Sequence, residues 1–207
     1  MPRQSELTEP IFQSSRFAIR IASTNDVPEL ADIIADSFHP KTGWWQWLYP
    51  LSRMGIYEDL RQRLHSHSPH YICFVAIANA GTSGHPWAPS SSSALGTIEM
   101  ALRPHSWYAN TSALPYLSNL AVRDRHRGQG IAQKLLLACE RTALSWGFKD
   151  LYLHVLENNY PAQRVYAKLD YRVSKVELGF SSRLFGQPRR MLLHKQFPQP
   201  DRPVGVR

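Results

Sequence analysis

The feature that most constrains this chain is a short basic turn with two glycines, set between an apolar run and an amphipathic helical pattern. The segment reads LAVRDRHRGQGIAQKLLLACE and runs from Leu120 to Glu140. Glycine lets the backbone approach a ligand closely, and the free N–H groups and positive dipole end at a helix start attract a phosphate group. The pattern therefore predicts a phosphate-binding turn, although a purely structural tight turn fits the same spacing.

Two nucleotide-binding motifs do not fit this turn. A Walker loop needs GxxxxGK[ST], but Ile-Ala-Gln-Lys follows Gly130, so the Lys-Ser/Thr pair that would serve the terminal phosphate and Mg²⁺ is missing. A dinucleotide fingerprint, GxGxxG, needs a third glycine where Gln133 stands. We therefore expect a phosphate-bearing ligand that brings no metal ion, and no metal site.

Composition narrows the class of protein. The 207 residues are 43% hydrophobic, which suits one compact domain with a substantial core. No apolar run approaches the roughly 18 residues of a membrane-spanning helix, and the N-terminal residues lack the apolar core of a secretory signal. We therefore expect a cytoplasmic protein with no membrane partner. Cys73 and Cys139 lie in apolar segments, which predicts buried thiols without a disulfide.

The formal net charge of +8 favours an anionic partner: nucleic acid, an acidic protein surface or a phosphorylated cofactor. Charge alone does not choose among these three. The basic residues form no long arm, and their densest cluster, Arg123 to Arg127, is short and runs into the two glycines. This arrangement favours a local phosphate site, and no nucleic-acid-binding motif is recognisable, so we expect no nucleic-acid partner.

The order of the predicted elements indicates an α/β fold with a mixed central sheet and helices on both faces. The polar ends, 1–16 and 198–207, are expected to be flexible tails around one domain at 17–197. A helix opened by an Asp26–Glu29 capping box and a helical pair separated by Pro50 are expected before the first long strand. Strands are predicted at 17–21, 71–78, 94–102, 114–122, 151–155, 171–176 and 190–195, and the remaining helices at 128–146 and 159–169.

The turn and the residues after it resemble the GNAT superfamily of acetyltransferases. The family's pyrophosphate loop is written [Q/R]-x-x-G-x-[G/A], and a later stretch is written N-x-x-A-x-x-x-Y-x-K-x-G-[FY]. The first pattern is filled by Arg125, Gly128 and Gly130, and the second by Asn159, Ala162, Tyr166, Lys168 and Tyr171. Asp170 replaces the usual glycine, at a position that often closes a helix in a left-handed conformation. The resemblance implies the GNAT fold, is specific from Tyr116 to Tyr171, and covers the earlier residues in element order only.

This resemblance also implies how acetyl-CoA would be bound. The backbone of the strand before the turn would pair with the pantetheine arm, the turn would hold the pyrophosphate, and the helix after Asn159 would hold the far side of the cofactor. The implied cofactor-binding residues are Leu120, Ala121, Val122, Arg125, His126, Arg127, Gly128, Gln129, Gly130, Ile131, Asn159 and Tyr166.

Acetyl transfer to an amine requires a base for the amine and an acid for the departing thiolate. By resemblance, Tyr166 is the general acid, His154 occupies a position where some protein N-terminal acetyltransferases carry the base, and Tyr116 helps to hold the deprotonating water. His154 alternates with apolar neighbours on its strand, and a neutral imidazole suits proton uptake near pH 7. Glu99 is an alternative base, although a solvated or salt-bridged glutamate is its ordinary role. Direct transfer in a ternary complex is expected.

The acceptor is the least specified part of the prediction. The motifs are similar to those of cyanobacterial and plastid-type members and of protein N-terminal acetyltransferases, which implies a protein or peptide amine, either an α-amine or a lysine. A small amine is the catalytic alternative, and the basic charge counts against polyamines and aminoglycosides. A non-catalytic module that senses acyl-CoA is the alternative from another class.

Overall fold

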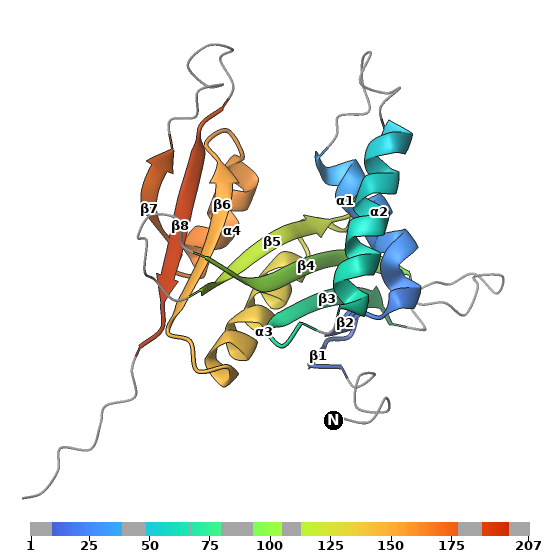
Figure 1. Ribbon diagram of the computed structural model, residues 1–207, viewed down its shortest axis with the longest axis horizontal. Coiled ribbons are helices and arrows are strands. Elements are labelled where there is room, and N and C mark those ends of the chain that lie inside the picture. Colours follow the sequence, from blue (N-terminus) through green and yellow to red (C-terminus); the bar gives the residue numbers. More distant parts are fainter. Residues whose placement is uncertain are drawn as a thin grey trace, which may run out of the picture. The chain divides into compact units, whose positions relative to one another are not determined.

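The computed structural model describes residues 10–38, 49–66, 68–79, 93–104, 113–177 and 188–198, and these residues confirm the mixed α/β class. The eight strands hydrogen-bond in the order β1-β2-β3-β4-β5-β6-β8-β7. The chain divides into two compact units, which are drawn in Figure 1. Unit 1 comprises Met1–Ala101 and Leu117–Cys139, and unit 2 comprises Leu102–Tyr116 and Glu140–Arg207.

The strands of unit 1 begin with an antiparallel series. In chain order they are β1 (Phe12–Gln13), β2 (Phe17–Ile21), β3 (Tyr71–Ala78), β4 (Ala94–Arg103) and β5 (Leu114–Val122). Neighbours from β1 to β4 are antiparallel, and the strands predicted at 71–78 and 94–102 are β3 and β4 of this series. The boundary between the units falls within β4 and β5.

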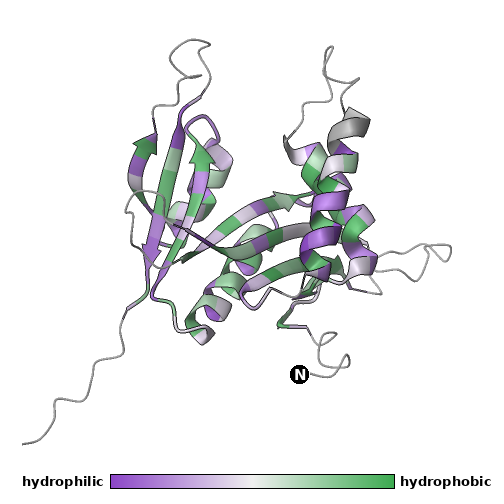
Figure 2. Cartoon of the chain, viewed as in Figure 1, coloured by the Kyte–Doolittle hydropathy of each residue, from purple (hydrophilic) through white to green (hydrophobic). Residues whose placement is uncertain are grey.

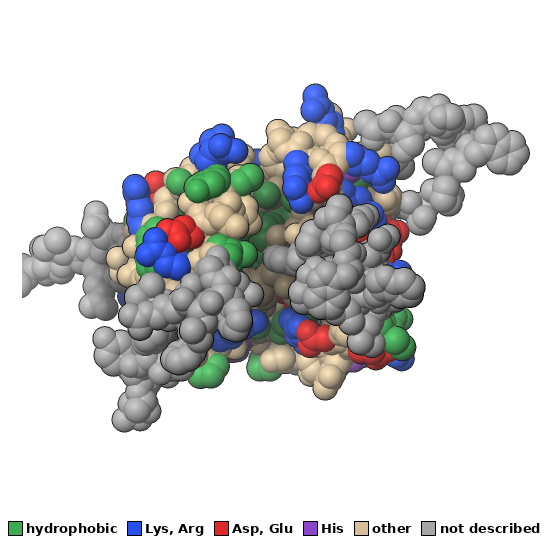
Figure 3. Space-filling model, turned by 90° about the horizontal axis from the view of Figure 1, so that it is seen from above, with side chains coloured by type: hydrophobic (Ala, Val, Ile, Leu, Met, Phe, Trp, Pro, Cys, Tyr) green, Lys and Arg blue, Asp and Glu red, His purple; other side chains and the backbone are tan. Residues whose placement is uncertain are grey.

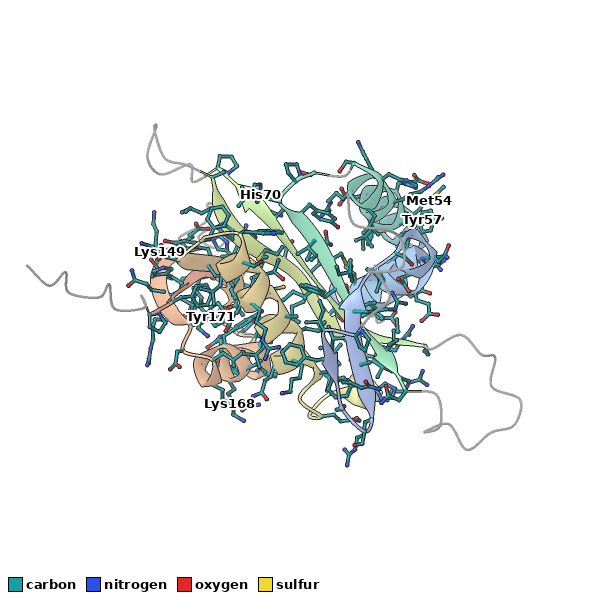
Figure 4. The ribbon with its side chains drawn as sticks, turned by 90° about the horizontal axis from the view of Figure 1, so that it is seen from below. Met54, Tyr57, His70, Lys149, Lys168 and Tyr171 are labelled. Carbon is teal, nitrogen blue, oxygen red and sulfur yellow. The ribbon has the colours of Figure 1, made fainter. Side chains whose placement is uncertain are left out.

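Two helices, α1 (Val27–Phe38) and α2 (Tyr49–His65), lie side by side against the strands of unit 1. Leu30, Ile33 and Ile34 form a buried apolar stripe along α1, and it packs in one cluster with Leu60 and with Cys73 of β3. Figure 4 shows Met54 and Tyr57 on α2, of which Met54 is 65% exposed and Tyr57 packs against this cluster. The apolar periodicity of α1 therefore places its stripe in the core on this face of the sheet.

Three sequence predictions for unit 1 are corrected by the structure. Phe12–Gln13 pairs with β2, so the predicted tail 1–16 contains an edge strand, and the Phe12 ring also lies 5.3 Å from the Lys134 ammonium. Pro50 lies inside α2, in its first turn, where its missing N–H costs nothing, and the residues before Tyr49, where the other helix of the pair was expected, lie outside the described residues. The capping box uses Ser23 and Asp26 in the short 3-10 helix Thr24–Asp26, and not Glu29. Residues 1–9, 39–48 and 199–207 lie outside the described residues.

Unit 2 contains a second set of strands with one short helix. Its elements are β6 (Asp150–Leu156), α4 (Tyr160–Lys168), β7 (Arg172–Glu177) and β8 (Arg190–Gln196), together with the end of α3 (Ile131–Ser145). The strand β8 is antiparallel to both β6 and β7. Buried Leu151, Leu153 and Val155 alternate with half-buried residues along β6, and Figure 2 shows such alternation in hydropathy along these strands.

The helix ends in unit 2 follow the predicted signals. Gly147 has φ +84° and follows α3, as expected of a C-terminal glycine. Asp170 has φ +64°, which confirms that the position usually filled by glycine is left-handed. Lys168 is exposed at the end of α4, whereas Tyr171 is buried, and both are labelled in Figure 4. The turn after α4 therefore returns the chain to the core of unit 2 without a glycine.

Candidate functional site

The predicted phosphate-binding turn is present in unit 1, between β5 and α3. A single 3-10 turn, Asp124–His126, follows β5, and the chain then passes through Gly128 at φ +76° and Gly130 at φ +82°. A Cβ built on Gly128 meets nothing within 4 Å, so the left-handed backbone, and not crowding, is what requires glycine there. The turn therefore opens to the surface at the start of α3.

The backbone amides of this turn have the arrangement that an anion needs. The hydrogen bond from Lys134 N–H to the Gly130 carbonyl, 3.1 Å long, is at the first turn of α3, so the preceding N–H groups have no acceptor within the helix. The positive dipole end of α3 is at the same place. The Arg125 and Arg127 side chains are exposed beside it, and Arg127 pairs with Asp124 at 2.7 Å. The turn therefore fits the pyrophosphate of a coenzyme.

Side chains around the turn adjust its charge and its position. Burial, together with Arg125 and Arg123, lowers the pKa of His126, so this imidazole is neutral near pH 7. The Arg123 guanidinium donates to the Ala94 carbonyl at 2.8 Å, and Arg127 Nε donates to the Val122 carbonyl at 3.2 Å. These bonds fix the turn to the ends of β4 and β5.

Gly96, which lies near the turn, was not predicted from the sequence to have a role. A Cβ on Gly96 of β4 would lie 2.8 Å from the Ala121 carbonyl oxygen and 3.1 Å from a Val122 methyl group. The glycine therefore allows close approach of the strand before the turn. An isolated glycine inside the apolar run ALGTIEM was the available signal. Ala121 and Val122 are themselves buried and Leu120 is half-buried, and their pairing with pantetheine stays a prediction.

Glu99 is buried and salt-bridged, which matches the ordinary structural role of a glutamate and not that of a base. Its side chain is 1% exposed, and its Oε2 accepts hydrogen bonds from Arg63 at 2.7 Å and from the Tyr71 hydroxyl at 2.9 Å. Its Oε1 accepts from the Asn119 amide at 2.5 Å, and Asn119 has φ +53°. Both carboxylate oxygens are thus occupied by donors within unit 1, which favours a structural role over that of a base.

In unit 2, the structure brings Tyr116 and His154 together. The Tyr116 hydroxyl on β5 lies 2.8 Å from Nδ1 of His154 on β6, and the two ring centroids are 5.7 Å apart. As the alternation along β6 predicted, His154 points opposite to the buried Leu153 and Val155. A phenol and an imidazole in contact can pass a proton between them.

A carboxylate that the sequence analysis missed completes this arrangement. Glu177, at the end of β7, places Oε1 3.2 Å from Nε2 of His154, with side chains that are 25% and 18% exposed. The two atoms lie within ion-pair distance without the alignment of a hydrogen bond, and the pair carries opposite charges only when the histidine is protonated. If the Tyr116 hydroxyl donates to Nδ1, the imidazole proton is on Nε2 and faces Glu177. The cluster formed by these three residues is called the Tyr–His–Glu cluster below.

The charges around the Tyr–His–Glu cluster keep its histidine neutral. Burial lowers the pKa of His154, Glu177 opposes that effect, and Arg190 and Arg103 add to it. Burial raises the pKa of Tyr116, against the effect of the same two arginines. At neutral pH the cluster therefore consists of a neutral phenol, a neutral imidazole and a carboxylate.

Tyr166 and Asn159 both belong to α4. Tyr166 is 7% exposed, its ring meets the Tyr171 ring edge-on at 5.9 Å, and burial, with a smaller effect of Tyr116, raises its pKa. Its phenol is therefore protonated at neutral pH. The Asn159 side chain accepts a hydrogen bond from Ala162 N–H at 3.2 Å, so it caps the N-terminus of α4.

The surface and the helices add two observations. On the face that Figure 3 shows, Lys and Arg side chains occur in several separate places, some of them directly beside Asp or Glu. None of the helices in the described part of the chain is long and apolar enough to cross a membrane.

Comparison with known proteins identifies what this chain resembles. Residues 35–171 match the model of the acetyltransferase (GNAT) family. The Arabidopsis thaliana protein GCN5-related N-acetyltransferase 10, chloroplastic, is 26% identical over 84% of this chain and 68% of its own length.

Solved structures share the fold. Arabidopsis thaliana NAA60 in complex with a bisubstrate analogue has a TM-score of 0.65 at 18% identity and covers 87% of this chain and 98% of its own; it has also been solved with acetyl-CoA. The ribosomal-protein-S18-alanine N-acetyltransferase from Escherichia coli has a TM-score of 0.62 at 13% identity, with 92% and 99% coverage.

Proposed function

Because residues 35–171 match its model, this chain belongs to the acetyltransferase (GNAT) family, and we propose that it acetylates the α-amine of protein or peptide N-termini. The chain is an acetyl-CoA-dependent N-acetyltransferase, and the proposal concerns its acceptor and the roles of its residues. The observation that carries the proposal is the contact of 2.8 Å between the Tyr116 hydroxyl and a neutral, half-buried His154.

A neutral histidine of lowered pKa suits an α-amine better than a lysine. The attacking amine must be unprotonated, and an α-amine has a pKa near 7.8 whereas lysine has one near 10.4. At pH 7.5 roughly a third of α-amines are neutral, compared with about one lysine in a thousand. Such a weak base can complete the deprotonation of an α-amine, directly or through a water held by Tyr116, but it is poorly matched to a lysine.

The roles of the remaining predicted residues follow from their chemistry. The amides between Gly128 and Ile131 would hold the pyrophosphate, and the exposed Arg125 and Arg127 would add charge. Tyr166, which keeps its proton at neutral pH, would donate it to the departing thiolate. The family therefore supplies the acetyl donor, and this chain's residues supply an acid, a base and a phosphate site.

Similarity supports a peptide acceptor without specifying it. One structure with the same fold is named for the alanine of a ribosomal protein, and another was solved with a bisubstrate analogue. A small amine and a non-catalytic acyl-CoA sensor are the competing functions, and the presence of a placed phenol, imidazole and carboxylate favours catalysis over sensing.

A thiol-release assay tests the proposal. Purified protein and acetyl-CoA are mixed with peptides that have a free N-terminus and no lysine, with N-terminally blocked peptides that contain lysine, and with small amines. We expect thiol release with the first set, and mass spectrometry should find the acetyl group on the α-amine. Release only with small amines or only with lysine peptides contradicts the α-amine proposal, and cofactor binding without any release supports the sensor.

A further inference from the structure

We propose that Arg103 and Arg190 select acceptors that carry an acidic side chain beside the amine, so that the preferred substrates are peptides with an acidic residue at or next to the N-terminus. This inference rests on the proposed function. It concerns which α-amines the enzyme accepts, and not whether it accepts them.

Two guanidinium groups approach the Tyr–His–Glu cluster from different strands. Arg103, the last residue of β4, places its guanidinium carbon 4.4 Å from the centroid of the Tyr116 ring. Arg190, the first residue of β8, is paired in register with Leu156 of β6 and with Glu177 of β7. It interacts with the Tyr116 side chain and, together with Arg103, lowers the pKa of both Tyr116 and His154. Both positive charges therefore act on the group that would deprotonate the acceptor.

In the described part of the chain, these two charges are not used in an ion pair. Among the ion pairs between described residues, none contains Arg103 or Arg190, although both side chains are exposed. Neighbouring cations in unit 2 are paired: Arg189 with Glu157 and Lys195 with Glu140. The stretches that continue the chain from the two arginines, 105–112 and 178–187, contain no Asp or Glu. A carboxylate from the acceptor would therefore supply the missing counter-charge.

The charge balance of the cluster indicates the sign of the preferred acceptor. The cluster consists of Tyr116 from β5, His154 from β6 and Glu177 from β7. The charged groups beside it are Arg103 from β4 and Arg190 from β8. His154 is neutral, so Glu177 offsets one of the two arginine charges, and one net positive charge remains from the two guanidinium groups. They repel a second cation near the amine and attract an anion, and both effects weaken with added salt because the arginines are exposed.

The test uses peptides that differ at a single position. Three peptides share an N-terminal alanine and carry Glu, Gln or Lys as the second residue. A second series carries the same three residues at the N-terminus itself, and free glutamate and glutamine form a third arm. We expect kcat/KM to be about fivefold higher for Glu than for Gln and lowest for Lys, the size typical of an exposed charge pair, and we expect the ratio to shrink at high salt.

Variants assign the preference to the two arginines. Arg103→Gln and Arg190→Gln should each lower the Glu-to-Gln ratio, and Arg190→Glu should shift the preference toward the Lys peptide. Arg189→Gln is the matched control, because it removes an adjacent arginine that is already paired with Glu157, and it should keep the ratio. Thermal unfolding of each variant confirms that it is folded.

The outcomes separate this inference from the proposed function. Equal turnover of Glu, Gln and Lys peptides, or an unchanged ratio in both Arg→Gln variants, overturns the inference and leaves the α-amine function intact. Turnover of free glutamate but of no peptide supports the carboxylate preference and contradicts the peptide acceptor. Loss of the ratio in Arg189→Gln as well overturns the assignment to Arg103 and Arg190.

Discussion

The phosphate-binding turn of unit 1 and the Tyr–His–Glu cluster of unit 2 are built in opposite ways. The turn is one continuous segment that acts through backbone amides and the left-handed conformations of Gly128 and Gly130. The cluster takes one side chain from each of three strands, β5, β6 and β7. A site built from backbone should depend on backbone conformation, and a site built from side chains on individual functional groups. Gly128 tests the site built from backbone, and Tyr166, His154 and Glu177 test groups that act through their side chains.

The largest effect is expected at Tyr166, the proposed acid. Replacing Tyr166 with Phe removes the only proton that this buried side chain can donate, so kcat should fall by roughly a hundredfold or more, the usual contribution of a general acid. The affinity for acetyl-CoA, measured by calorimetry, should change little. Tyr171→Phe is the control, because that ring is also buried and lies against Tyr166. A Tyr166→Phe enzyme with normal kcat would remove this residue as the acid.

The sequence predicted the conformation of the turn and the orientation of His154 because their signals are local. A glycine at φ +76° and the helix after it lie within one short segment, and the apolar alternation of β6 correctly oriented His154. Asp170 was likewise recognised as left-handed from its position alone. Each of these features depends on residues that are close together in the sequence, so the sequence alone is enough to predict it.

The remaining features could not be predicted because they depend on the register between strands. Glu177 reaches His154 through the pairing of β6 with β8 and of β8 with β7, which no spacing along the chain encodes. The contact of Glu99 with Arg63 joins residues 36 positions apart, and strand β1 forms only because β2 offers an edge. The C-terminal limit of the domain at 197, its cytoplasmic location and the pairing of Leu120 to Val122 with pantetheine stay predictions.

The second largest effect is expected at His154, the proposed base. His154→Gln should lower kcat/KM by about thirtyfold at pH 7, less than the roughly hundredfold or more usual for general acid–base catalysis, because part of the α-amine is already neutral. The deficit should shrink as the pH rises, because the α-amine then loses its proton without help. His194→Gln is the control on the neighbouring strand, where the histidine is paired with Asp150 at 2.7 Å. A deficit in His154→Gln that is constant between pH 6 and pH 9.5 would contradict its role as the base.

A smaller effect, on binding alone, is expected at the turn. Gly128→Val puts a β-branched residue at φ +76°, which costs about 1–2 kcal/mol or distorts the amides, so the affinity for acetyl-CoA should fall about tenfold or more. Gly55→Ala in α2 is the control. A Cβ added at Gly55 meets nothing within 4 Å, and the backbone of this residue is not left-handed. Calorimetry measures both. Unchanged affinity in the Gly128 variant would show that the backbone of this turn does not hold the cofactor.

The smallest effect is expected at Glu177, and it is a shift in pH dependence. The carboxylate stabilises the protonated imidazole and so raises the pKa of His154 against burial and the two arginines. Glu177→Gln removes that effect, so the pKa of His154 should fall, and the acid limb of the kcat/KM profile should move to lower pH.

A base of lower pKa accepts a proton less readily, so the plateau rate of Glu177→Gln should fall about threefold as well. Glu157→Gln, which removes an exposed carboxylate paired with Arg189, should leave the profile in place. A shift of the acid limb to higher pH, or no shift, would mean that Glu177 does not act on the charge of His154. In a site of this kind, the pKa of His154 depends on Glu177, which is 23 positions away in the chain and is brought close by strand pairing.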